Sequence, residues 1–159
     1  MHALNYLFFL MIAKLAYGEF YWSSAGEIAG KVCVQWYEPA DIQGTWDDNY
    51  LCSDQDWGIQ FNEDGPISGM TCTQILETAD PNTWDDNYLC VPNDSPLVFT
   101  WSSNGANCNG DGIVQILETA DPHTWDDNFL CWSIQTGVTM NNFRLRLNSD
   151  VCEHPSTCS

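Results

Sequence analysis

Residues 74–90 read QILETADPNTWDDNYLC, and residues 115–131 read QILETADPHTWDDNFLC. The two stretches differ at only two of 17 positions. A third copy, QWYEPADIQGTWDDNYLC at 35–52, carries one extra residue before the shared string TWDDNYLC. Self-similarity at a fixed period is the signature of a repeat architecture, in which each copy is one supersecondary unit.

The repeat also extends upstream of these stretches. The sequence FYWSSAG at 20–26 matches FTWSSNG at 99–105, and residues 61–65 are a shortened version. The period is therefore about 38 to 41 residues. It predicts three copies and a tail, at about 20–57, 58–96, 97–134 and 135–159.

The residue pattern within a copy favours β-strands over helices. Residues 32–37 and 70–77 are rich in β-branched and aromatic residues, and a further strand begins at 88–90. Turn formers separate these runs, and a turn is expected at 85–87. We therefore predict an all-β fold stabilised by disulfides. The three copies are expected to close about a pseudo-threefold axis, as in a β-prism or β-trefoil, which removes exposed strand edges. An open array of three modules is the alternative.

The N-terminal segment has the features of a secretory signal peptide. Residues 7–13 form an uninterrupted apolar run, and Ala16-Tyr17-Gly18 supplies the small residues that a signal peptidase accepts. We predict cleavage after Gly18, which leaves residues 19–159 as a single secreted domain. The apolar run is too short for a permanent membrane span.

All eight cysteines lie after the predicted leader. An even number of cysteines in an oxidising compartment implies a disulfide framework. Equivalent positions in the copies should behave alike, which favours one bridge within each copy and one in the tail. The predicted pairs are Cys33–Cys52, Cys72–Cys90, Cys108–Cys131 and Cys152–Cys158.

The composition restricts the classes of partner. The chain has 22 Asp and Glu against four Lys and Arg, for a formal charge of −18. Nucleic acids are excluded as partners, because their binding depends on Lys and Arg that neutralise phosphates. An aromatic content of 13% and a hydrophobic content of 44% argue against disorder. Cations, glycans or glycoproteins, and basic proteins remain as candidate partners.

Each copy places an indole next to carboxylate and amide groups, which is a combination that can bind a sugar. The indole could stack on a pyranose ring while Asp and Asn bond its hydroxyls. The candidate ligand-binding residues are Trp46, Asp47, Asn49, Trp84, Asp85, Asn87, Trp125, Asp126 and Asn128. The structural alternative is that the repeated Trp residues pack in the core and the Asp-Asn pairs form turns.

The motif Asp-x-Asn-x-Leu at 47–51, 85–89 and 126–130 resembles the Asp-x-Asn-x-Val centre of bulb-type mannose-binding lectin repeats. The resemblance covers about five residues in each copy. It implies a threefold β-prism and sugar contacts by the Asp and Asn residues. The glutamine that precedes the motif in that family is a threonine here, as at Thr83.

The same acidic segment also has the ligand types of a calcium site. Glu77, Asp80 and Asp86 could join Asn oxygens around Ca²⁺, a hard cation that takes about six to eight oxygen ligands. Residues 107–118 further satisfy most of the spacing of an EF-hand loop. A turn-rich hairpin loop in the third copy explains that match without calcium.

The sequence contains no nucleophile elbow, zinc-protease motif, phosphate loop or dinucleotide fingerprint. Three equivalent sites suit multivalent binding better than catalysis, so no enzymatic activity is expected. The leading hypothesis is a secreted, multivalent, lectin-like carbohydrate-binding protein, with or without calcium. The alternative is an acidic extracellular structural or matrix protein with repeated calcium-binding turns. A toxin or host-defence factor is a third hypothesis.

Overall fold

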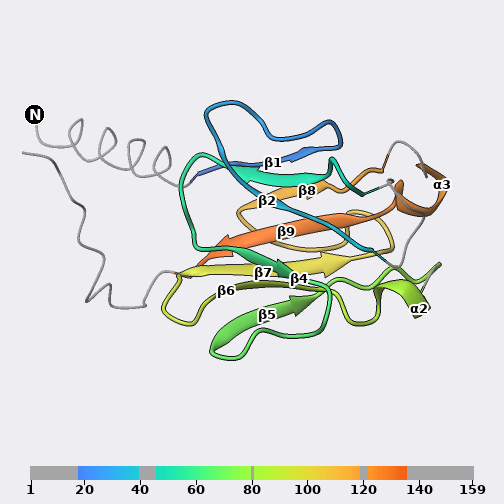
Figure 1. Ribbon diagram of the computed structural model, residues 1–159. Coiled ribbons are helices and arrows are strands. Elements are labelled where there is room, and N and C mark those ends of the chain that lie inside the picture. Colours follow the sequence, from blue (N-terminus) through green and yellow to red (C-terminus); the bar gives the residue numbers. More distant parts are fainter. Residues whose placement is uncertain (1–17, 40–45, 80, 119–121, 136–159) are drawn as a thin grey trace, which may run out of the picture.

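The computed structural model describes residues 18–39, 46–79, 81–118 and 122–135 (Figure 1). Within these residues each copy forms one antiparallel sheet of three strands. The strands are β1 (Phe20–Ser23), β2 (Val32–Gln35) and β3 (Tyr50–Ser53) in the first copy, β4 (Gln60–Asn62), β5 (Met70–Gln74) and β6 (Tyr88–Pro92) in the second, and β7 (Leu97–Ser102), β8 (Gly112–Gln115) and β9 (Phe129–Ile134) in the third. The predicted all-β class and its tandem organisation are confirmed.

The last strand of each copy lies in the middle of its sheet. The strand orders are β1-β3-β2, β4-β6-β5 and β7-β9-β8. In the first two copies the register places the two cysteines directly opposite each other, Cys33 against Cys52 and Cys72 against Cys90. Both pairs form disulfides with a Cα–Cα distance of 4.0 Å. Each bridge therefore joins an outer strand to the central strand of its own sheet.

The third copy departs from this register. Ile113 occupies the position opposite Cys131, and Cys131 is instead bonded to Cys108 in the preceding loop, with a Cα–Cα distance of 6.0 Å. Gly112 lies opposite Trp132, and a Cβ built on Gly112 would come within 2.0 Å of the indole ring. A glycine is required here because the ring lies against the backbone. The predicted Cys152–Cys158 bridge lies outside the described residues.

Two single helical turns were not predicted. These are α2 (Pro81–Trp84) and α3 (Pro122–Trp125), and both lie at the same end of the molecule (Figure 1). Each begins with proline, which is preset for the first helical position, where no backbone donor is needed. The turn expected at 85–87 follows directly after α2. The proline at the start of each turn is the sequence signal that indicates these helical turns.

The core is centred on three tryptophans, one from each copy. Trp46, Trp84 and Trp125 are at most 1% exposed. Their ring centroids lie 4.4 to 4.6 Å apart, with planes at 62° to 67°. Edge-to-face packing at this spacing is favourable for aromatic rings. Each indole therefore contacts the other two, and the three copies share one core.

The sheets contact one another in a cyclic order. Strand β2 lies against β4, β5 against β7, and β8 against β1. At two of these junctions an indole N–H bonds a backbone carbonyl of another copy, Trp22 to Leu117 and Trp101 to Leu76, both at 2.9 Å. The equivalent residue at the third junction is Phe61, which stacks on Trp36 at 4.9 Å. A larger Trp36, where other copies have Ile, is thus accommodated by a smaller partner.

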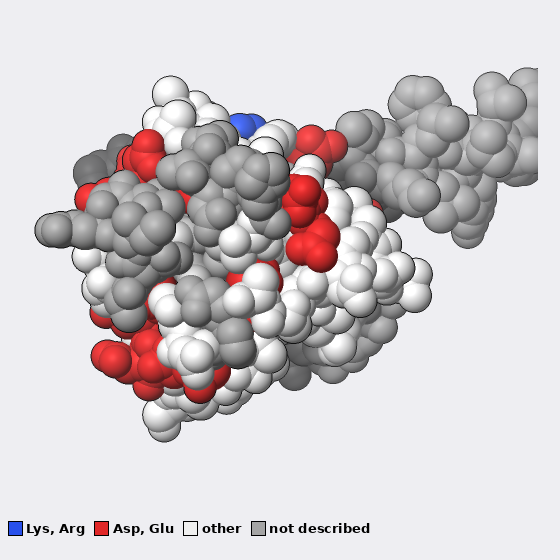
Figure 2. All heavy atoms as spheres, turned by 90° about the vertical axis from the view of Figure 1, so that its right-hand side faces the viewer, with Lys and Arg blue, Asp and Glu red and all other residues white. Residues whose placement is uncertain are grey.

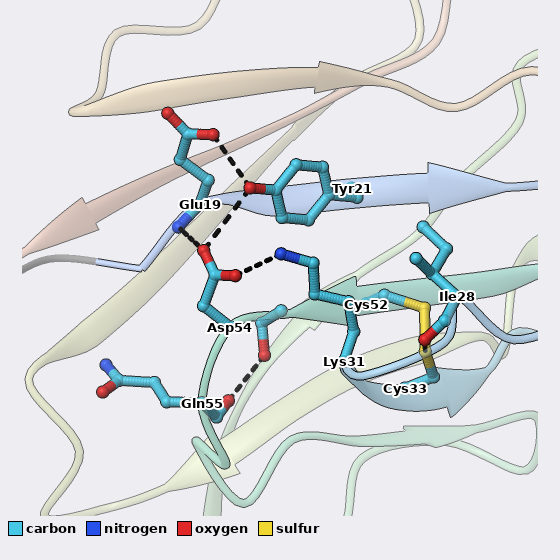
Figure 3. Close-up of polar contacts among 9 residues, drawn as sticks. Glu19, Tyr21, Ile28, Lys31, Cys33, Cys52, Asp54 and Gln55 are labelled. Atoms are coloured by element: carbon cyan, nitrogen blue, oxygen red, sulfur yellow. Dashed lines mark hydrogen bonds and ion pairs between the residues drawn. A yellow bond between two sulfur atoms is a disulfide. The ribbon is translucent and has the colours of Figure 1, made fainter.

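The first described residues are held by a polar network on the outer face of the first sheet (Figure 3). Lys31 forms an ion pair with Asp54 and lies 4.3 Å from the centroid of the Tyr21 ring. The hydrogen bond from Lys31 lowers the pKa of the Asp54 carboxyl and correspondingly raises the pKa of Lys31. The Tyr21 hydroxyl donates to Glu19 at 2.9 Å, which raises the tyrosine pKa. The network attaches the start of β1 to the end of β3.

The placement of the tryptophans generates a stability prediction. Trp84→Ala removes a fully buried indole and should lower the free energy of unfolding by about 4 kcal/mol. Tyr37→Ala, at a side chain that is 38% exposed, is the control and should change it by less than about 0.5 kcal/mol. Denaturant unfolding of the oxidised protein measures both. Wild-type stability in the Trp84 variant would contradict the shared core.

Candidate functional site

The structure corrects the expectation that the repeated tryptophans stack on a sugar. All three indoles form the core described above, and the amides that accompany them, Asn49, Asn87 and Asn128, are 0% exposed. A ligand could not reach these six side chains without opening the contact between the copies. Only the aspartates of the predicted sugar sites, Asp47, Asp85 and Asp126, are exposed. The tryptophans fit the alternative interpretation, in which they pack in the core.

The buried amides have a different role, because each binds a glutamate from another copy. The Asn87 side chain donates to Glu38 at 2.6 Å. Asn128 donates in the same way to Glu77, and Asn49 to Glu118. The three glutamates are at most 5% exposed. A buried carboxylate is costly to desolvate, so these hydrogen bonds connect the copies where separation would be unfavourable.

The predicted calcium ligands are also used within the fold or lie apart from it. Glu77 accepts from Asn128 and, at 2.6 Å, from the Ala79 backbone N–H. Asp86 is exposed, and Asp80 lies outside the described residues. No cluster of three acidic, His or Cys side chains in the described part of the chain is arranged to hold a metal ion. A discrete calcium cage therefore remains a prediction without support from the geometry; its predicted ligands are Glu77, Asp80 and Asp86.

Candidate ligands within the EF-hand spacing at 107–118 are likewise used in contacts of the fold. Asp111 accepts a hydrogen bond from the Ile134 backbone N–H at 2.7 Å. Glu118, at the other end of the spacing, binds Asn49 of the first copy. Cys108 within the loop forms the bridge to Cys131. The segment is a loop between β7 and β8, but it is not a hairpin loop, because both strands pair with β9 and not with each other.

What remains at the surface is a pair of aspartates after each core tryptophan. Five of the six side chains are exposed and the sixth is half-buried; the pairs are Asp47 and Asp48, Asp85 and Asp86, and Asp126 and Asp127. Because two of the pairs directly follow α2 and α3, they lie at the end of the molecule that carries these turns. Figure 2 views this end and shows acidic side chains at several places around it. We call these six residues the acidic end.

The backbone of each pair is fixed by two repeated hydrogen bonds. In the second copy the Gln74 side chain donates to the carbonyl of Asp85 at 2.6 Å, and the Gly65 N–H donates to the carbonyl of Asp86 at 2.7 Å. Gly65 has a φ of 101°, a conformation that favours glycine. The same bonds recur in the other copies, from Gln35, Gln115, Gly26 and Gly105. The fold therefore uses the aspartate carbonyls and leaves their carboxylates to solvent.

The second copy has additional acids beside its pair. Glu63 and Asp64 lie in the β4–β5 turn, whose equivalent residues are Ser24 and Ala25 in the first copy. Burial raises the pKa of Glu63, and the charges of Glu38, Asp64 and Asp86 raise it further. Glu63 therefore lies within the field of three other acidic residues at the junction of the first and second copies. Glu63 occurs in one copy only, so the repeat pattern gives no signal for it.

Comparison with known proteins gives no relative from which a role could be transferred. No protein-family model, curated protein or solved structure matches the chain. In the described part of the chain, no helix has the length and apolar character that crossing a membrane requires. A functional assignment therefore depends on the site itself.

The contacts between copies can be tested with a double-mutant cycle. Asn87→Ala removes a donor from buried Glu38 and should cost about 3 kcal/mol of stability. The Glu38→Ala and double variants should show a coupling of at least about 1 kcal/mol in denaturant unfolding. Asn82→Ala, at an exposed position of α2, is the matched control and should stay within about 0.5 kcal/mol of wild type. Additive effects of the two core changes would argue against the contact.

A second prediction concerns pH. The folded pKa of Glu63 is raised, so its ionised form is disfavoured by folding and the penalty is full above that pKa. Glu63→Gln should raise stability by about 0.3 kcal/mol at pH 7, a value reduced by solvent screening. At pH 3 the gain should disappear, because Glu63 is then protonated in both states. Glu27→Gln, at an exposed acid of the first copy, serves as the control. An equal gain at both pH values would contradict the charge argument.

Proposed function

We propose that this protein is an extracellular, acidic structural protein that binds calcium-bearing surfaces through the acidic end. The observation that carries the proposal is the repeated pair of aspartates, fixed through its backbone and exposed through its side chains. Three disulfides in the described residues agree with an oxidising, extracellular environment. No enzymatic activity is part of the proposal.

The near-equal contacts among the copies support a specific arrangement of the pairs. We infer that the three sheets are related by a pseudo-threefold axis, as in a β-prism or β-trefoil, and that the three tryptophans surround this axis. The ring spacings of 4.4, 4.5 and 4.6 Å are what such an axis requires. Each pair directly follows one of these tryptophans, so the three pairs would surround the axis at one end. Equivalent sites on one face can engage a surface together, and avidity multiplies modest affinities.

Charge favours a cationic surface over the other candidate partners. The formal charge of −18 raises the local concentration of cations, and carboxylate oxygens are preferred ligands of calcium. A pair of neighbouring aspartates supplies too few ligands for a closed calcium cage. It can, however, complete the coordination of a calcium ion that already belongs to a mineral or a calcium-rich matrix. Binding is then distributed over the acidic end and needs no pocket.

The proposal predicts a stepwise loss of binding as pairs are removed. The mature protein should adsorb to calcium phosphate particles, and Asp85→Asn with Asp86→Asn should weaken adsorption by about tenfold. Neutralising a second and a third pair should weaken it further in similar steps. Asparagine is a turn former as well as aspartate, so the fold should be retained. Adsorption isotherms and the ionic strength needed for elution measure the effect.

The matched control removes the same charge elsewhere. Asp56→Asn with Asp94→Asn neutralises two exposed acids that are not part of the acidic end. If this control weakens adsorption as much as the Asp85 and Asp86 change, only net charge matters and the proposed face is wrong. Absence of adsorption by well-folded wild-type protein would overturn the proposed function.

A further inference from the structure

A cleft lies where the two connections between copies come together. Its lining residues are Asp56, Trp57, Pro92, Asp94, Ser95 and Pro96, its volume is about 130 Å³, and it is partly open to solvent. Asp56 and Trp57 lie in the connection between β3 and β4. Pro92 ends β6, and the remaining three residues lie in the connection between β6 and β7. A smaller hollow adjoins it and shares Asp56 and Trp57. The cleft is smaller than the usual small-molecule site of about 300 to 1,000 Å³, so a ligand would fill it with a single ring and extend into solvent.

The repeat explains the aspartates of the cleft but not its tryptophan. Asp56 and Asp94 follow the central strands at equivalent positions, four residues after Cys52 and Cys90. By the same alignment Trp57 is equivalent to Ser95. The fold therefore tolerates a small polar residue at this position. The large aromatic residue in the first copy packs against the core, with its ring centroid 6.5 Å from that of Phe20, and it also forms part of the cleft wall.

The indole of Trp57 also lacks a partner that its chemistry requires. Its N–H is buried and makes no hydrogen bond in the described structure. Gly18 lies next to this nitrogen, since a Cβ built on Gly18 would lie 3.7 Å from Nε1. Gly18 is the last residue of the predicted leader. Cleavage after Gly18 would therefore remove a neighbour of the indole N–H.

The polar groups of the cleft restrict the kind of ligand that fits. Asp56 uses one carboxylate oxygen to accept from the Gly58 N–H at 2.8 Å, which leaves its other oxygen available. The Ser95 oxygen accepts from the Leu97 N–H at 3.2 Å, so its own proton can be donated. Asp94 is exposed. The cleft thus offers two carboxylate acceptors, two donors and an apolar wall.

The acceptors, donors and apolar wall of the cleft can be compared with the chemistry of each class of small ligand. An anion would be repelled by Asp56, Asp94 and the net charge of −18. A cation would satisfy the carboxylates and leave the indole N–H without an acceptor. A hydroxyl group both donates and accepts, so a neutral polyhydroxylated ring satisfies both kinds of group. Its C–H face can pack on the indole and on Pro92 and Pro96.

We infer that the cleft of Asp56, Trp57 and Asp94 binds a single saccharide ring, at a site distinct from the acidic end. This is carbohydrate binding at one asymmetric site, in place of the three symmetric sites that the sequence predicted. The C–H face of the ligand ring packs on the cleft wall, while its hydroxyl groups accept a hydrogen bond from the Trp57 N–H at the indole edge and donate protons to Asp56 and Asp94. Its affinity is independent of the calcium-bearing surface that the acidic end is proposed to bind.

The experiment uses the secreted, processed protein on an array of immobilised mono- and oligosaccharides, followed by competition with the free methyl glycoside of the strongest hit. Trp57→Phe keeps a ring and removes the N–H, and should weaken binding by about tenfold, the effect of one lost hydrogen bond. Trp57→Ala should abolish binding. Asp56→Asn with Asp94→Asn should also weaken it at least about tenfold, because charge-assisted bonds are replaced by neutral ones. Thermal unfolding checks that each variant is folded.

The matched control is Asp85→Asn with Asp86→Asn, which removes the same charge at the acidic end and should leave glycoside binding unchanged. Wild-type binding by both Trp57→Phe and the Asp56 and Asp94 variant would overturn the inference. So would the absence of any saccharide signal from folded wild-type protein. Neither result would affect adsorption to calcium phosphate, so failure of this site is distinguishable from failure of the proposed function.

Discussion

The fold depends on buried glutamates that are hydrogen-bonded across the boundaries between copies. Glu38, Glu77 and Glu118 are almost fully buried, and each accepts from an asparagine of a different copy. A copy on its own would leave both the carboxylate and the amide without this partner. Because an unsatisfied buried polar group is expensive, isolated copies are disfavoured relative to the assembled three. The tryptophans have the same property, since each indole contacts two others.

The sequence was sufficient to predict the elements that repeat within one copy. Strand positions, the turn after Trp84 and the bridge between Cys72 and Cys90 are local, and each follows from residue type and spacing. The partner of Asn87 could not be predicted in this way. Glu38 and Glu77 have the same surroundings in the sequence, so pattern alone does not distinguish a contact within a copy from one between copies. Only the packing of the sheets decides it.

The predicted site shows a related limit. Placing Trp, Asp and Asn side by side in the sequence suggested one functional unit, but the backbone turn directs these side chains to different environments. Trp84 and Asn87 face the core, whereas Asp85 and Asp86 face solvent. Neighbours in sequence are therefore separated by burial. Trp57 is the opposite case, in which residues distant in sequence come together. It does not recur in the other copies, yet it lines a cleft with groups from the second copy.

The repeated acidic residues likewise fall into a buried group and a surface group. Among the repeated acids, the glutamates belong to the contacts between copies, and the aspartate pairs contribute only their carbonyls to the hydrogen bonds that fix the turn. Asparagine or serine would form such a turn without like-charge repulsion between neighbours. All six positions nevertheless carry a carboxylate. The bonds that fix these turns use the backbone carbonyls and so do not account for the six carboxylates, which the proposed function assigns to contacts outside the protein.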